Sequence, residues 1–328
     1  MGNKIGIAGF GYYLPEKKVS VKELCRKAGI PEIVAGYIGA ETVGEADIDE
    51  LPSDMAIKAA EAAVKDANIN PSEIDLIINC PAGMQDYILP SVVGKVQHAI
   101  GANNSVCFEV QQGCCGMLTG LEIAYAYILS GRYNTVLLLS SDKWSAYTDH
   151  HSAEAVVFGD GAGAVIVRKN TESFFIKDFI FKTAGKFYNL YGINSGGVKN
   201  ISLNEDSLKY KCLNPEIARK EFKNIYISSF GEISRKILNK NRLKDTDIKY
   251  LSMVNANLKL LDVVASELNI SLDKTCREYL ITYGHVGGFD IFFNMLKASE
   301  ANKLNKGDLT LLLNAGIGFT WGAALIEY

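Results

Sequence analysis

Two adjacent cysteines lie between glycines in the segment Val110–Leu118, which reads VQQGCCGML. Cys114 follows a short strand-like run, Ser105–Val110, and opens a helix-like run, Cys114–Gly131. A thiol at the first turn of a helix meets the positive end of the helix dipole, which favours the nucleophilic thiolate. Cysteine is also a common small core residue, and we interpret Cys115 in that way. From this segment alone, Cys114 is either a nucleophile or a residue that packs the helix against a sheet.

Of the four histidines, His285 has the context that best suits a catalytic base. It lies in the glycine-flanked segment Tyr283–Asp290, YGHVGGFD, where an imidazole can take up or release a proton near neutral pH. Asp290 can either orient and stabilise the charged imidazole or cap the helix-like run that begins there. The sequence leaves both roles of Asp290 open. The other histidines are predicted to be structural or to lie in an exposed loop: His98, His150 and His151.

A second glycine-rich turn, Ala315–Gly322 (AGIGFTWG), follows the pattern of a buried strand. Its backbone N–H groups, together with the N–H of Cys114, can bind a developing oxyanion. The alternative is a hairpin that needs positive φ angles. A further segment, Gly6–Gly11 (GIAGFG), runs into YYLP and not into a helix, so the context of a dinucleotide fingerprint is missing and we exclude nicotinamide chemistry.

The composition excludes several other classes of function. The 328 residues are 48% hydrophobic and 22% charged, with a formal net charge of −3. This mildly acidic balance predicts no binding of nucleic acid or of an anionic membrane. No apolar run approaches the roughly 20 residues that cross a bilayer. The seven cysteines are scattered and form neither a metal-ligand pattern nor a disulfide framework, so we predict a cytoplasmic protein that binds no metal.

The chain contains an internal repeat. The strand-like run Glu73–Cys80 has a counterpart 174 positions later, at Asp247–Val254. The same offset relates Asn134–Leu139 to Asp308–Leu313. Two matches in the same order predict a duplicated α/β unit, with a site where the two halves meet.

This repeat predicts that the two candidate catalytic segments face each other. At the same offset Cys114 corresponds to Gly288, which lies inside the histidine-containing loop. We expect the first half to span residues 1–170 and the second half to span residues 215–328. The polar and aromatic segment 171–214 between them is predicted to be a loop-rich insertion, which either caps the site or is a surface excursion.

Four segments resemble the β-ketoacyl-acyl carrier protein synthase III branch of the thiolase superfamily. They read GFGYYLPEKKVS, FEVQQGCCGML, FGDGAGAVIV and LTLLLNAGIGFTWGAALIEY, and the resemblance covers nearly the whole chain. It implies a thiolase-like duplicated αβαβα fold of five layers, and usually a homodimer. It also implies an acyl-cysteine intermediate on Cys114, with the N–H groups of Cys114 and Gly318 as the oxyanion hole.

The resemblance also shows where this sequence departs from condensing members, which use a histidine in a PHQAN-like segment and an asparagine in a GNTS-like one. Here the first segment reads MVNAN, so Val254 takes the histidine position, and His285 takes the asparagine position. Asn257 and Lys259 still match positions that bind substrate. Valine donates no hydrogen bond, and losing one oxyanion donor typically costs about 2.7–4 kcal/mol of barrier. We therefore predict that ordinary decarboxylative elongation is lost.

The remaining thiol, imidazole and carboxylate suit acyl transfer to a small-molecule alcohol, amine or thiol, with His285 as the base. Divergent relatives of this family catalyse such transfers with Cys–His–Asp, and this sequence is similar to them. Water as the acceptor would make the protein a thioesterase. Two alternatives stay open: a condensing enzyme in which His285 alone serves the carbon nucleophile, and a non-catalytic scaffold that dimerises with an active relative.

The acyl donor is expected to be a thioester, and no resident cofactor is predicted. In the segment that supplies a tryptophan and an arginine for the coenzyme A adenine in related enzymes, Ile33 and Tyr37 take those places. This favours the phosphopantetheine of an acyl carrier protein over free coenzyme A as the acyl carrier. Leu89 matches the family position that reaches toward the acyl pocket of the partner subunit.

Overall fold

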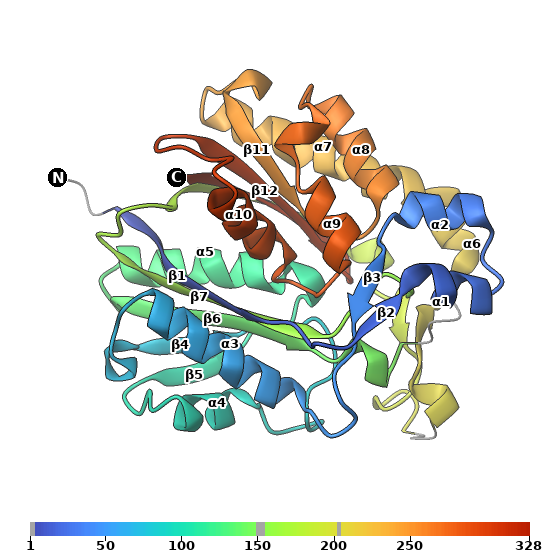
Figure 1. Cartoon of the computed structure of the whole chain (residues 1–328), viewed down its shortest axis with the longest axis horizontal. Helices are drawn as coiled ribbons and strands as arrows, with labels where there is room; N and C mark the ends of the chain where they lie inside the picture. The colour runs from blue at the N-terminus through green and yellow to red at the C-terminus, as the bar shows by residue number, and fades with distance from the viewer. Residues whose placement is uncertain (1–3, 149–154, 202–204) are drawn as a thin grey trace.

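A computed structural model describes residues 4–148, 155–201 and 205–328, and His150 and His151 lie outside these ranges. The main sheet contains β1 (Ile5–Tyr13), β4 (Leu76–Asn79), β5 (Val106–Glu109), β6 (Thr135–Asp142), β7 (Gly161–Lys169), β8 (Phe175–Thr183), β11 (Ile248–Met253), β12 (Leu309–Gly316) and β13 (Thr320–Glu327). Within the described residues these form a nine-stranded mixed sheet in the order β11-β12-β13-β8-β1-β7-β6-β4-β5 (Figure 1). Two short sheets pair β2 (Lys18–Ser20) with β3 (Thr42–Gly44) and β9 (Tyr191–Ile193) with β10 (Tyr210–Cys212).

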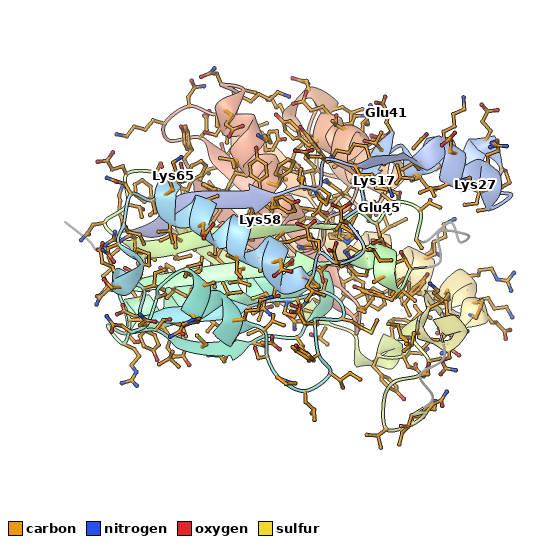
Figure 2. The ribbon with its side chains drawn as sticks, turned by 60° about the horizontal axis from the view of Figure 1, so that its bottom comes forward. Lys17, Lys27, Glu41, Glu45, Lys58 and Lys65 are labelled. Atoms are coloured by element: carbon orange, nitrogen blue, oxygen red, sulfur yellow. The ribbon has the colours of Figure 1, made fainter. Side chains whose placement is uncertain are left out.

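Helices cover both halves of the sheet and separate them. They are α1 (Val21–Lys27), α2 (Glu32–Ile38), α3 (Pro52–Asp66), α4 (Val93–Ala99), α5 (Gly116–Leu129), α6 (Pro215–Ile217), α7 (Lys223–Lys240), α8 (Leu258–Glu267), α9 (Arg277–Tyr283) and α10 (Asp290–Glu300). α3 packs on β1 and β7 at the outer face of the first half, and its Lys58 and Lys65 are labelled in Figure 2. α5 lies between the halves and contacts both β6 and β13, whereas α10 packs on β11 and β12 and α7 on β8 and β13 (Figure 1). The result is a layered αβαβα arrangement.

The duplication predicted from the sequence is confirmed. β12 begins and ends 174 positions after β6, and α10 begins 174 positions after α5. All eight residues of β6 are buried, as expected for an apolar strand that lies between helices on both faces. None of the helices in the described ranges is both long and apolar enough to span a membrane.

The prediction of a loop-rich insertion at 171–214 is wrong for Phe175–Thr183, which forms β8. This strand pairs antiparallel with β13 along its length and joins β1 at the pair Gly6 and Phe175, so it connects the two halves of the sheet. The sequence hid it for two reasons. Charged residues interrupt its apolar pattern, FIKDFIFKT, and it begins 170 positions after β1 and not 174.

Candidate active site

Cys114 lies in a 3-10 turn, Gly113–Cys115, between β5 and α5. Gly113 has a φ of +53°, a left-handed conformation that glycine adopts without strain. The side chain of Asn314, near the end of β12, donates a hydrogen bond of 2.8 Å to the carbonyl of Cys114 and so ties the turn to the second half. Cys115 is fully buried, as predicted for a core residue, and burial raises the pKa of its thiol so that it stays uncharged. Cys114 is partly exposed.

The structure brings the thiol of Cys114 and the ring of His285 together. The distance from Cys114 Sγ to His285 Nε2 is 3.1 Å, a hydrogen-bond contact between residues from different halves of the fold. The backbone of His285 is fixed on both sides, because its N–H donates to Val157 O and its carbonyl accepts from Gly159 N–H, each at 2.9 Å. The side chain of His285 is only 3% exposed. The predicted proximity of these two residues is therefore present in the structure.

Asp290 contacts the imidazole and is not the cap residue of α10. Its Oδ2 lies 2.5 Å from His285 Nδ1 and also accepts the N–H of Asn255 at 2.9 Å, while its Oδ1 accepts the N–H of Val286 at 2.9 Å. Asp290 is the first residue of α10, whose cap residue Phe289 makes no side-chain cap bond. All three of these partners of the carboxylate are N–H groups, which suits an ionised carboxylate holding Nδ1–H toward it and Nε2 toward the sulfur.

The charges in this triad favour a protonated ring. Burial opposes the charged form of His285, but the nearby Asp290 carboxylate and Cys114 outweigh it and raise the pKa of His285 well above its ordinary value. A cationic imidazole next to a thiol stabilises the thiolate by charge attraction. The arrangement can therefore hold a nucleophile and a proton at the same site.

The glycine-rich turn of the second half lies directly against the cysteine turn. A Cβ on Gly316 would be 2.0 Å from Gln112 O, and a Cβ on Gly113 would be 2.9 Å from the backbone nitrogen of Ile317. Gly318 follows with a φ of +128°. Such backbone contact between the two turns fits the predicted pairing of the Cys114 and Gly318 N–H groups at an oxyanion, which remains a prediction.

Two asparagines that the sequence analysis did not identify support the histidine loop. Asn255 follows β11, and its Nδ2 donates to Gly284 O at 2.9 Å, in addition to its backbone bond to Asp290. Asn294 in α10 donates to Asn255 Oδ1 at 2.9 Å. The available signal was the position of Asn255 after a buried strand, since sites collect at the carboxyl ends of strands in α/β folds.

Asp142, the last residue of β6, is a second buried carboxylate near the triad. It accepts hydrogen bonds from Ala82 N–H at 3.0 Å, Gly83 N–H at 2.7 Å and the Ser140 hydroxyl at 3.2 Å. Burial raises the pKa of Asp142 to about 6, against the opposing effect of these bonds. A Cβ on Gly287 in the histidine loop would be 2.6 Å from its Oδ2, so the loop packs on this carboxylate. The sequence analysis did not identify Asp142, although a polar residue at the end of an apolar strand was again a signal for it.

The other predicted site residues have the following surroundings in the structure. Val254, which takes the position of the family's histidine, is buried. Its alkyl side chain makes no hydrogen bond. Asn257 is the N-cap of α8, where its Oδ1 accepts the Leu260 N–H at 2.8 Å. Lys259 is exposed, and Leu89 is 92% exposed. Roles of Asn257, Lys259 and Leu89 in substrate binding stay predictions.

With the fold and this geometry established, comparison with known proteins gives a consistent match. The family model described as 3-oxoacyl-[acyl-carrier-protein] synthase III matches residues 108–185, and the model of its C-terminal part matches residues 238–328. The β-ketoacyl-[acyl-carrier-protein] synthase III of Rickettsia bellii is 32% identical, over 98% of this chain and 99% of its own length. The chain belongs to the β-ketoacyl-acyl carrier protein synthase III family. Members of this synthase III family transfer or condense acyl groups.

Solved structures of synthase III type have the same fold. The 3-oxoacyl-[acyl-carrier-protein] synthase III from Aquifex aeolicus superposes with a TM-score of 0.83 at 27% identity, over 100% of both chains. OleA from Xanthomonas campestris, solved with bound lauric acid and lauroyl-CoA, gives a TM-score of 0.85 over 100% of both chains. Its identity is 18%, so this likeness concerns the fold alone. The predicted thiolase-like fold is confirmed.

The structure places the two residues that the resemblance assigns to the donor side on the surface of the molecule. Ile33 and Tyr37 lie on α2 and are 65% and 50% exposed. Neither side chain supplies the guanidinium that the family resemblance places there. In the described ranges, no group of three or more His, Cys, Asp or Glu side chains is placed to hold a metal ion.

Proposed function

We propose that this synthase III family member is an acyltransferase that moves an acyl group through a thioester on Cys114 to an alcohol, amine or thiol acceptor. The observation that carries the proposal is the continuous contact from Cys114 Sγ to His285 Nε2 (3.1 Å) and from His285 Nδ1 to Asp290 Oδ2 (2.5 Å). A nucleophile, a base and an orienting carboxylate in this order are the parts of a covalent acyl-transfer site.

In the first half-reaction the Cys114 sulfur attacks the carbonyl carbon of the donor thioester. The new carbon–sulfur bond forms as the bond to the donor sulfur breaks, and the thiol proton passes through His285 Nε2 to the departing thiolate. The N–H groups of Cys114 and Gly318 stabilise the negative charge that develops on the carbonyl oxygen.

In the second half-reaction His285 is the general base for the acceptor. Its Nε2 removes the proton of the acceptor while the acceptor's oxygen, nitrogen or sulfur attacks the acyl-Cys114 carbonyl, and the Cys114 sulfur leaves. The proton then returns from His285 to that sulfur. Asp290 stabilises the imidazolium between these steps through its contact with Nδ1.

A condensing reaction is the second candidate, and the relatives of the same length that are named as synthases favour it. In that reaction His285 alone would stabilise the enolate formed from the carbon nucleophile. Val254 argues against a two-donor enolate site, because an alkyl side chain donates no hydrogen bond.

We infer that an acyl carrier protein delivers the acyl group and that the enzyme is a homodimer. The exposed Ile33 and Tyr37 support the first inference, since neither side chain offers the guanidinium with which an arginine can contact the adenine nucleotide of coenzyme A. Exposed apolar residues beside the unpaired edge of β5 support the second.

Intact-mass measurement after incubation with acyl carrier proteins tests the lead proposal. Acylation at Cys114, followed by release on adding an acceptor, is the expected result. A His285→Ala variant should become acylated more slowly, because it lacks the proton relay, and should then retain the acyl group. Rapid decarboxylation of malonyl carrier protein by the wild type would support condensation instead, and absence of acylation with every donor, on coenzyme A or carrier protein, would contradict both enzymatic candidates.

A further inference from the structure

The two asparagines behind the histidine loop are completely buried. Asn255 is 1% exposed and Asn294 is 0% exposed, although the neighbours of Asn294 in α10 include the buried Phe293 and Met295. A buried amide without hydrogen-bond partners lowers stability, so buried amides in folded proteins are nearly always bonded. The contacts of these two side chains therefore show what they hold in place.

Asn255 ties both ends of the histidine loop. Its Nδ2 donates to Gly284 O, just before His285, at 2.9 Å, and its backbone N–H donates to Asp290 Oδ2 at 2.9 Å. That oxygen is also the one that contacts His285 Nδ1. Asn255 is itself anchored, because the residue before it donates its N–H to a carbonyl of β12 at 3.0 Å. The positions of His285 and Asp290 are therefore held relative to the sheet through Asn255.

Asn294 fixes the amide of Asn255. Its Nδ2 donates to Asn255 Oδ1 at 2.9 Å and to Met253 O, at the end of β11, at 3.0 Å. The Nδ2 of Asn255 also lies 3.5 Å from Asn294 Oδ1. Since β11 and α10 pack against each other (Figure 1), these bonds join the end of the strand to the helix that Asp290 begins. The two amides bond to each other as well as to the backbone around them, and so they form one unit.

This amide pair adds no charge to the site. Ionisable groups from other elements act on the imidazole and its carboxylate: Cys114 in the turn before α5, Asp142 at the end of β6 and Cys276 before α9. Burial raises the pKa of Cys276 to about 12, so that thiol stays uncharged. Asparagine does not titrate, and the two amides therefore hold the loop without a charge that would compete with the Asp290 carboxylate.

We propose that Asn255 and Asn294 form a positioning unit that keeps Asp290 against His285 during the proton-transfer steps of acyl transfer. If Gly284 is released, His285 Nδ1 can move away from the carboxylate, and burial then favours the uncharged ring. The unit acts on the chemistry at His285 and not on acceptor binding, because its bonds go to the histidine loop, to Asp290 and to β11. The inference rests on the proposed function and deepens it.

The first test follows the His285 ring directly. NMR of protein labelled at the ring nitrogens gives a titration curve for each of the four histidines, and the His285 signal is the one that is missing in His285→Gln. In Asn255→Ala the pH midpoint of this curve should fall by about one unit or more, because the imidazolium loses part of its contact with the carboxylate. Asn294→Leu keeps the side-chain volume but removes the bonds to Asn255, and it should shift the midpoint in the same direction. Asn103→Ala removes an exposed asparagine and is the matched control.

The second test separates positioning from a general loss of stability. Single-turnover kinetics with acyl carrier protein should show that Asn255→Ala releases the acyl group more slowly, by on the order of 100-fold. The acceptor concentration that gives half of the maximal rate should not change. The double variant of Asn255→Ala and Asn294→Leu should be no slower than Asn255→Ala alone, because the two residues act as one unit.

A purely structural role of the two asparagines predicts a different outcome. A folded Asn255→Ala or Asn294→Leu protein that melts at a lower temperature but keeps the wild-type titration curve of His285 would overturn the inference. If Asn255→Ala does not fold, Asn294→Leu and Asn255→Ser decide by the same titration, since the serine hydroxyl is too short to hold Gly284. If no carrier protein acylates the wild type while the titration shifts as expected, only the proposed function fails.

Discussion

At the scale of single residues, the site depends on the three N–H groups that contact the Asp290 carboxylate. Replacing it with asparagine puts an NH₂ group against at least one of those donors and removes the charge that stabilises the imidazolium. We expect Asp290→Asn to slow release of the acyl group by on the order of 10³–10⁴-fold. Single-turnover kinetics of acyl-enzyme formation and decay would measure this, with exposed Asp273→Asn as the control. Unchanged decay would remove Asp290 from the proposed mechanism.

His285 should also give stability a characteristic pH dependence. Because its folded-state pKa is raised, the native protein keeps a proton that the unfolded chain loses above about pH 6.5. The resulting stabilisation is complete below that pH and is lost as pH rises through the raised pKa. Urea unfolding of wild type and His285→Gln at a series of pH values measures the effect. The difference between their unfolding free energies should shrink as pH rises, and parallel curves would show that His285 is not charged in the native state.

At the scale of elements, Asp142 links the end of β6 to the segment after β4. Its pKa of about 6 lies above the value of about 3.9 for an unfolded aspartate, so the native state binds its proton more tightly. As pH rises from about 4 to about 6, the wild type should therefore lose stability through this group. Asp142→Asn keeps one acceptor oxygen for the Ala82 and Gly83 N–H groups and should flatten that fall. Denaturant unfolding across this range measures it, and an unchanged slope would contradict the raised pKa.

The elements also explain which parts of the site the sequence could predict. Buried apolar runs mark β6 and β12, and their constant offset was enough to place Cys114 opposite the loop of His285. Asn255 and Asp142 act through bonds to backbone groups far away in the chain, which leave no local pattern. β8 was missed because Lys177, Asp178 and Lys182 interrupt its apolar pattern and it does not keep the offset of 174.

The sequence also could not distinguish two roles for Asn257 and Asp290. A helix cap and a functional residue can have the same local sequence. Asparagine and aspartate are both preferred at helix N-termini. Only the three-dimensional contacts distinguish them: Asn257 accepts a bond from Leu260 of its own helix, whereas Asp290 is directed to His285. The spacing along the chain does not contain that difference.

At the scale of the whole molecule, β5 is one of the two edge strands of the nine-stranded sheet in the described residues. It lies at one end of the strand order, and its Val106 side chain is 53% exposed. The segment after β4 lies beside it, because the Ser91 hydroxyl donates to Glu109 at 2.8 Å. That segment carries Ile88 and Leu89, which are 77% and 92% exposed. An unpaired strand edge next to exposed apolar side chains is a face suited to association.

We therefore expect the wild type to be a homodimer joined across this face, with Leu89 buried at the contact. Leu89→Asp places a charge in that contact and should shift the protein to monomer, because burying an unpaired carboxylate costs several kcal/mol. Val198→Asp is the matched control, since Val198 is 98% exposed and lies in the segment after β9, which is not part of the nine-stranded sheet. Sedimentation velocity at micromolar concentration distinguishes the species. A monomeric wild type, or a Leu89→Asp protein that stays dimeric, would mean that β5 is protected in some other way and that Leu89 does not reach a partner.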